Sequence, residues 1–273
     1  FRHGATVLTR TRCFLSNRIS IMSSAINMNW LSSAEGESLL HHFYDHSTKK
    51  RRFYGILERP ALPSSIEEVT YKVFMIGRPG AGKTSVINRL SGIVGESGGY
   101  AESNGIRKTT VFWPVKIWDK VVLFKLQFWD TSENSIKKYN HILPVSDFLV
   151  LHEMFTNPLR ACKDKVDAIC SVFTFDEPTS FRDIPYLMNS MTATTENPAN
   201  IVIGTKLAFT TMAVTDNQVK EFEERWKTKV IKMDTNKTSA RPEILDCSYQ
   251  MNCICKALWN RDQDFISKQI IQV

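Results

Sequence analysis

The sequence lacks long hydrophobic segments, and its cysteines lack the spacing of a zinc site. No stretch reaches 18 apolar residues, so no membrane-spanning helix is expected. Of the six cysteines, Cys253 and Cys255 form C-x-C and the others are scattered. This distribution argues against a structural zinc site and favours reduced thiols in a cytoplasmic protein.

A strong charge of one sign is also missing. The net charge is +7, but four of the arginines lie within the first 21 residues. The remaining chain is too mildly basic to indicate nucleic-acid binding. Residues 1–21 contain arginine and serine but no acidic residue and no Met, a composition that mitochondrial transit peptides can have. We favour the alternative, translated upstream sequence or an incomplete gene model with Met22 as the first residue. The last four residues, IIQV, hold no cysteine for prenylation, so any membrane contact is expected to be peripheral.

The strongest positive signal is the stretch YKVFMIGRPGAGKTSVINRL, from Tyr71 to Leu90. An apolar run, Val73–Ile76, precedes Gly77–Thr84, which fits the pattern G-x-x-x-x-G-K-[ST]. Apolar residues then recur at helical spacing at Val86, Ile87 and Leu90. A strand, a glycine loop and a helix are thus predicted in the order that a phosphate-binding loop requires.

The chemistry of this pattern is the binding of a nucleoside phosphate. Backbone N–H groups of a glycine-rich loop and the start of the following helix attract phosphate oxygens. Lys83 is expected to reach the β- and γ-phosphates, and the Thr84 hydroxyl to bind Mg²⁺. The remaining predicted phosphate contacts are Gly77, Gly80, Ala81, Gly82 and Ser85.

A β-hairpin is predicted after the loop, from Thr110–Ile117 and Val121–Trp129. The second run ends in Trp129-Asp130-Thr131. A carboxylate at the end of a strand beside the phosphate-binding strand is placed to organise Mg²⁺, so Asp130 is the second predicted metal residue.

The rest of the chain alternates between strands and helices. Strands are predicted at Ala168–Phe175 and Ile201–Ile203. One helix is predicted from Thr179, a second from Thr215, where Thr215-x-x-Gln218 forms a capping box, and a last one through Leu258. One face of the last helix is marked by Met251, Ile254, Cys255, Leu258 and Trp259. This order predicts an α/β fold with a mainly parallel central sheet. We divide the chain into an extension, 1–63, and a P-loop domain, 64–273, with an insertion at 145–160.

Several motifs resemble those of the Ras-like small GTPases. They are GRPGAGKT for the phosphate loop, WDT for the Mg²⁺ motif, FDEPTSFRDIP after the fourth strand and IVIGTK at the base-binding strand. The stretches NWLSSAEGESLL, FYGILERP, TTVFWP, LQFWD and ALWNRDQ resemble one atypical, Rem- and Rab-like branch. The resemblance implies a Ras-like P-loop NTPase domain that binds GTP or GDP and Mg²⁺. It also implies work with planar polarity effector proteins of the ciliogenesis complex at the ciliary basal body, in vesicle traffic and exocytosis.

The sequence departs from the small-GTPase pattern where water would be placed for hydrolysis. Pro79 stands where a glycine is usual, and Glu133 replaces a glycine that would contact the γ-phosphate. Asn134 takes the place of the water-orienting Gln and is one methylene shorter. With Lys83, Asn134 is the only candidate catalytic residue, and intrinsic hydrolysis is expected to be slow or absent.

The base-binding motif also departs from the pattern. By the resemblance, Thr205 and Lys206 contact the base, but Ala208 stands where a carboxylate would read guanine. Ser239 and Ala240 resemble the segment whose backbone contacts the guanine carbonyl. Ser103, twenty residues after Lys83, is the best match for the further Mg²⁺ ligand, with Thr109 and Thr110 as substitutes.

We therefore expect an atypical GTP-binding protein that works as a nucleotide-dependent binding module. One alternative is an active hydrolase with relaxed base preference, because Ala208 cannot select guanine. The other is a nucleotide-independent scaffold, which Lys83, Thr84 and Asp130 argue against because they are intact.

Overall fold

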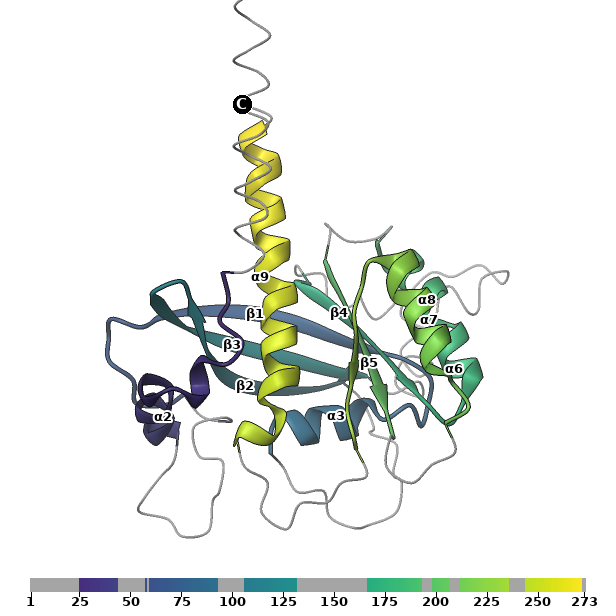
Figure 1. The fold of residues 1–273 in the computed structure, drawn as a ribbon, viewed down its shortest axis with the longest axis horizontal. Coiled ribbons are helices and arrows are strands. Elements are labelled where there is room, and N and C mark those ends of the chain that lie inside the picture. Colours follow the sequence, from purple (N-terminus) through teal and green to yellow (C-terminus); the bar gives the residue numbers. More distant parts are fainter. Residues whose placement is uncertain are drawn as a thin grey trace, which may run out of the picture.

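The computed structural model describes residues 25–43, 57, 59–92, 106–131, 166–192, 198–206, 212–235 and 244–271. Six strands form one sheet in the order β2-β3-β1-β4-β5-β6. Their bounds are β1 (Glu67–Ile76), β2 (Ile106–Ile117), β3 (Lys120–Thr131), β4 (Ala168–Thr174), β5 (Ala199–Thr205) and β6 (Val230–Lys232). Figure 1 shows the sheet lying between helices, so the predicted α/β class is confirmed.

The sheet is mixed. β2 runs antiparallel to β3, whereas β1 pairs in parallel with β3 and β4, and β5 pairs in parallel with β4 and β6. Every pair of neighbouring strands except the β2–β3 hairpin is therefore parallel, as expected of a mainly parallel sheet. The hairpin itself was predicted, and it is longer than its two apolar runs. Its turn passes through Trp118, whose φ of 51° lies in the left-handed region.

Helices cover both faces of the sheet. On one face lie α3 (Lys83–Leu90), the short η4 (Ile244–Cys247) and α9 (Ser248–Ile271). On the other lie α6 (Pro178–Arg182), α7 (Ile184–Thr192) and α8 (Asp216–Trp226). The start of α8 carries the predicted capping box, in which the Thr215 side chain accepts from the backbone of Gln218. Each face has its own apolar core, so the sheet is the middle of three layers.

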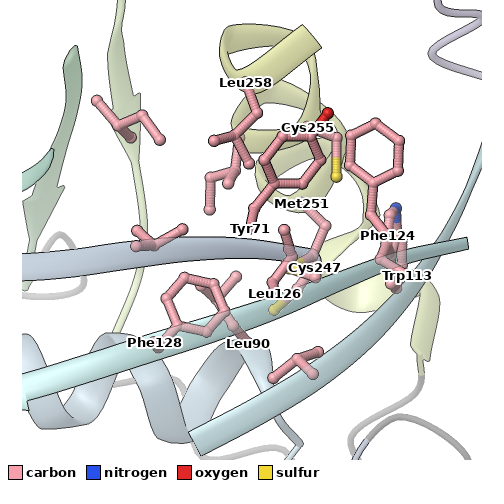
Figure 2. Close-up of a cluster of buried hydrophobic side chains, with 14 of the residues drawn as sticks. Tyr71, Leu90, Trp113, Phe124, Leu126, Phe128, Cys247, Met251, Cys255 and Leu258 are labelled. Atoms are coloured by element: carbon pink, nitrogen blue, oxygen red, sulfur yellow. The ribbon is translucent and has the colours of Figure 1, made fainter. Parts of the chain in front are cut away.

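The core beneath α9 is built from residues far apart in the sequence. Figure 2 shows Met251, Cys255 and Leu258 of α9 directed at aromatic and aliphatic side chains of the sheet and α3. Met251, Ile254, Cys255 and Leu258 are fully buried, as their spacing predicted. In Figure 1 the C-terminal part of α9 continues past the sheet.

The segment 25–43 packs on this same core. It contains η1 (Trp30–Ser32), α2 (Ala34–Leu40) and η2 (His41–Phe43), and it buries Trp30, Leu31, Leu40 and Phe43. Each such side chain stabilises the fold by about 1.5–3 kcal/mol. The backbone of the segment also bonds the hairpin, with Asn27 N donating to Lys116 O at 3.1 Å and Trp118 N to Ala25 O at 2.9 Å. Residues that we assigned to an extension thus contribute to the core of the sheet.

The remaining general expectations concern cysteines, metals and membranes. Within the described ranges Cys170, Cys247, Cys253 and Cys255 are free thiols. In that same part of the chain, no cluster of three His, Cys, Asp or Glu residues suits a metal ion. None of the described helices combines the length and the apolar character that a membrane span needs. The insertion at 145–160 lies outside the described residues.

Candidate functional site

The glycine loop joins the end of β1 to the start of α3. Gly77, Gly80 and Gly82 have φ values of 144°, 76° and 92°, a region that other residues rarely adopt. Gly77 also passes so close to β4 that a Cβ would lie 2.2 Å from the Val172 carbonyl oxygen. The loop therefore takes this shape only with glycine at these positions.

The start of α3 leaves backbone donors at the loop. Gly82 is the N-cap residue and has no side chain, so no side-chain cap bonds the first N–H groups of the helix. Ser85 is exposed in this first turn, and Ala81 is buried just before it. The N–H groups at the positive end of a helix favour an anion.

Lys83 lies across the same loop. Its Nζ donates to the carbonyl oxygens of Gly77, at 2.9 Å, and Arg78, at 3.1 Å. These bonds hold the ammonium group over the loop backbone rather than in free solvent. The predicted phosphate-binding cation is thus placed beside the helix N-terminus, with its charge directed to the same small region.

Two of the three predicted Mg²⁺ residues meet at this place. The Thr84 hydroxyl donates to Asp130 Oδ2 at 2.6 Å, although the residues are 46 positions apart. Asp130 is only 1% exposed, and its other oxygen, Oδ1, has no hydrogen-bond donor among the residues that the structure describes. A buried carboxylate oxygen without a partner is costly, because it loses water without replacement. A hard cation beside the Thr84 oxygen would remove that cost, so the residues present fit Mg²⁺.

Thr205 and Lys206 bring the end of β5 to the loop. Thr205 is fully buried, and its Oγ1 lies 2.8 Å from Ala81 O and 3.1 Å from Phe173 O. The hydroxyl therefore links the loop to β4 and β5. A Cβ on Gly82 would contact Thr205 Oγ1 at 3.2 Å, which shows how closely the two segments approach.

Lys206 is held in an unusual conformation next to Thr205. Its φ is 59°, its N–H donates to Thr235 Oγ1 at 3.2 Å, and its Nζ lies 3.6 Å from Asp176 Oδ2. Burial acts to raise the pKa of Asp176, but the Thr174 hydroxyl, the backbone and Lys206 outweigh it and lower that pKa. Lys206 thus has a left-handed backbone conformation, with its N–H and its Nζ both in contact with other side chains. Backbone strain of this kind is found at functional sites.

The sequence analysis missed Asp176 and Thr235 as partners of Lys206. Asp176 follows β4 closely, and the ends of neighbouring parallel strands meet at one edge of a sheet. That rule could have indicated Asp176. Thr235 could not have been found in this way, because it follows β6, a three-residue strand that the sequence analysis did not predict.

Several predicted site residues lie outside the described part of the chain. They are Ser103, Glu133, Asn134, Ala208, Ser239 and Ala240. Their roles remain predictions. The structure thus brings together the loop, Lys83, Thr84, Asp130, Thr205 and Lys206 at one edge of the sheet.

No protein-family model matches the chain. Ciliogenesis and planar polarity effector 2 of Xenopus laevis is 32% identical over 256 residues, which cover 89% of this chain and 95% of that protein. The protein of the same name from Xenopus tropicalis is 34% identical over 248 residues, or 86% and 90% of the two chains. The Homo sapiens protein is 29% identical over 260 residues, or 90% and 93%.

Identity at this level over nearly the whole length of both chains is enough to assign the family. The matched region includes the glycine loop and the strands around it, because it spans most of the sequence. The chain belongs to the ciliogenesis and planar polarity effector 2 family.

Proposed function

We propose that this protein binds a guanine nucleotide together with Mg²⁺ at the glycine loop, in a Ras-like P-loop domain. The observation that carries the proposal is the pair formed by Thr84 and the buried Asp130, whose Oδ1 meets no donor in the described part of the chain. It lies beside a loop that presents uncapped helix N–H groups and the Lys83 ammonium group. Donors for phosphate and oxygen ligands for a hard cation thus occur together.

Each residue has a distinct task in this proposal. Lys83 and the loop N–H groups bind the β- and γ-phosphates, and Thr84 and Asp130 hold Mg²⁺. When bound, Mg²⁺ neutralises charge on the phosphate oxygens. Lys206 lies along the base, and Thr205 keeps the base-binding edge attached to the loop. Ser239 and Ala240 are proposed to contact the base through their backbone.

Hydrolysis is proposed to be weak. Asn134 is shorter than the residue that usually orients water, and Glu133 adds negative charge near the γ-phosphate. A protein that holds its nucleotide without rapid turnover is suited to binding partners in one nucleotide state. The alternative function, an active hydrolase with relaxed base preference, is tested by the rate of nucleotide hydrolysis and by competition between nucleotides with different bases.

The cellular role is proposed from the relatives. Proteins named ciliogenesis and planar polarity effector 2 match most of this chain. The names of these relatives support a general role for this protein in ciliogenesis and planar polarity. Within it, we propose a nucleotide-dependent module that binds planar polarity effector proteins near the ciliary basal body and acts in vesicle traffic and exocytosis.

The test is the nucleotide content and the Mg²⁺ dependence of binding. Purified protein is denatured, and the released nucleotide is identified by chromatography. GTP is then titrated by calorimetry with and without Mg²⁺ for the wild type, Asp130→Asn and the control Asp119→Asn. Asp119 is exposed in the hairpin turn, at the other end of β3.

We expect bound guanine nucleotide in the wild type and a gain in GTP affinity on adding Mg²⁺. Asp130→Asn should lose that gain, because a neutral amide is a poorer ligand for Mg²⁺ than a carboxylate. Asp119→Asn should keep it. A wild type that binds no nucleotide, or a Mg²⁺ effect that survives Asp130→Asn, would contradict the proposal.

A further inference from the structure

Arg78, inside the glycine loop, directs its side chain away from the loop and into an ion pair. Its Nε lies 2.5 Å from Asp183 Oδ2, and its Nη1 lies 3.5 Å from Glu177 Oε1. Asp183 stands between α6 and α7, and Glu177 is the N-cap residue of α6. The contact therefore ties the loop to a helical segment about 100 residues further along the chain.

The backbone of Arg78 holds the loop together from the inside. Its carbonyl oxygen accepts from Lys83 Nζ at 3.1 Å and from Ala81 N at 3.2 Å. One residue thus fixes the lysine through its carbonyl group and contacts Asp183 through its side chain. A displacement of Arg78 would move the acceptor that positions the Lys83 ammonium group.

The carboxylate side of the ion pair rests on a rigid element. Asp183 N donates to Thr179 O, and Asp183 O accepts from Leu187 N, so its backbone is bonded on both sides. The next residue, Ile184, and Leu187 are buried in the core beneath α6 to α8. The backbone that carries the Asp183 carboxylate is therefore held within the helical segment, independently of the loop.

The loop needs such an anchor because of its composition. Gly77 and Gly80, on either side of the Arg78-Pro79 pair, adopt conformations that glycine reaches at little cost. The same freedom makes other loop conformations accessible. Pro79 has no N–H group, so it cannot donate a backbone hydrogen bond that would stabilise the observed conformation. An arginine attached to a fixed carboxylate limits these alternatives.

We infer that Arg78 is a positioning residue, held by Asp183, that keeps the loop and Lys83 in the geometry for binding phosphate. The inference rests on the proposed nucleotide binding. A competing role for Arg78 is direct contact with phosphate, with Asp183 withholding the side chain. The two roles predict opposite effects of removing the carboxylate. If Arg78 positions the loop, Asp183→Asn weakens binding, and if Arg78 binds phosphate, it strengthens binding.

The experiment measures the dissociation rate of fluorescently labelled GDP with Mg²⁺. The variants are Arg78→Met, Arg78→Lys, Asp183→Asn and the double variant Arg78→Met with Asp183→Asn. Arg59→Ala is the matched control, because Arg59 Nε also pairs with a carboxylate, that of Glu68, at 2.9 Å. Glu68 lies near the start of β1, roughly 25 Å along the strand from the loop. Thermal unfolding of every variant is recorded alongside.

We expect Arg78→Met and Asp183→Asn each to release the nucleotide roughly two- to five-fold faster, the range of partly exposed ion pairs. The double variant should be no faster than either single one, because both changes remove the same contact. Arg78→Lys should release the nucleotide more slowly than Arg78→Met. High salt should reduce the difference in release rate between the wild type and Arg78→Met, since the side chains of Arg78 and Asp183 are both partly exposed. Arg59→Ala should match the wild type.

The outcomes separate this inference from the proposed function. Slower or unchanged release from Asp183→Asn, or additive effects in the double variant, would overturn the positioning role while leaving nucleotide binding intact. An effect of Arg78→Met that is matched by a comparable loss of thermal stability would overturn it too. Absence of nucleotide binding in the wild type, where the rate cannot be defined, would overturn both.

Discussion

The hydrogen bond that places Lys83 in the glycine loop and the hydrogen bonds of Asn252 in the core beneath α9 differ in how far apart in the sequence their partners lie. Within the loop, Lys83 bonds the carbonyl group of Gly77, six residues earlier. Beneath α9, Asn252 accepts from Trp113 Nε1 at 2.8 Å and donates to Met28 O at 2.7 Å. These bonds span 139 and 224 residues.

The two regions also differ in burial. Lys83 and Thr84 are half-buried and can meet a ligand from solvent, whereas Asn252 is 1% exposed between apolar layers. Breaking a contact in the loop therefore changes what can bind. Breaking one beneath α9 leaves buried polar groups unpaired and changes the stability of the fold. The comparison predicts that binding and stability can be altered separately.

The largest expected effect is on binding in the loop. Lys83→Ala should weaken GTP binding by at least roughly 100-fold, because the cation on the β- and γ-phosphates is lost. Its unfolding free energy should stay near that of the wild type. Isothermal titration and chemical denaturation measure the two quantities. The control is Lys120→Ala, at the exposed hairpin turn. Equal GTP affinity in Lys83→Ala and the wild type would refute the phosphate-loop assignment.

The second prediction concerns the core beneath α9. Asn252→Ala should lower the unfolding free energy by about 2–4 kcal/mol, because the Trp113 indole N–H and the Met28 carbonyl group lose their buried partner. GTP affinity of the folded protein should not change. Urea denaturation measures the unfolding free energy. The control is Asn29→Ala, because Asn29 is an exposed asparagine next to Met28 in the segment 25–43. Loss of affinity at unchanged stability would contradict the separation of the two regions.

The third prediction extends the comparison to base selection. Because Ala208 offers no carboxylate, we expect a smaller preference for GTP over ATP than a site with an acid would show. Ala208→Asp should add about 1.5–3 kcal/mol of preference, the range of hydrogen bonds to a charged group. Competition binding with GTP, ATP and ITP measures it. Strong selectivity in the wild type that Ala208→Asp leaves unchanged would mean that another residue reads the base.

The smallest expected effect concerns alkaline stability beneath α9. Burial, followed by the hydrogen bond that the Tyr71 hydroxyl donates to Asp262 Oδ2 at 2.8 Å, raises the pKa of Tyr71. The unfolded state therefore loses the phenolic proton first, above about pH 10, while the folded state keeps it. The contribution of Tyr71 to stability is complete below that pH and falls by about 1.4 kcal/mol per pH unit above it.

Tyr71→Phe tests this contribution. The variant should be about 1 kcal/mol less stable at pH 8, where the hydrogen bond is lost, and its stability should fall less steeply between pH 10 and 11. Burial also raises the pKa of the Cys170 and Cys255 thiols, so some alkaline decline should remain in the variant. Urea denaturation from pH 8 to 11 measures it. Identical slopes for both proteins would show that Tyr71 does not titrate differently in the two states.

Local features of the sequence predicted much of this structure. Apolar spacing predicted α3 and the buried face of α9, and the Thr215-x-x-Gln218 pattern predicted the start of α8. The glycine motif predicted a strand, a loop and a helix in this order, and β1, the loop and α3 follow it. These features depend on residues a few positions apart, and their backbone preferences act before distant parts of the chain meet.

The sequence also predicted that Thr84 and Asp130 would act together, and the structure places them in contact. That inference used a rule about strand ends, because β3 lies beside β1 and both end at the same edge of the sheet. The same rule, applied to β4, would have predicted Asp176 beside Lys206.

Tertiary structure alone decided the remaining features. No local pattern indicates that residues 25–43 bury Trp30 and Phe43 in the core, that Asn252 joins Trp113 to Met28, or that Arg78 pairs with Asp183. Each of these contacts joins segments that lie far apart along the chain. Their formation depends on which helices cover which face of the sheet, because burial against a common core fixes the position of side chains that local propensity leaves free.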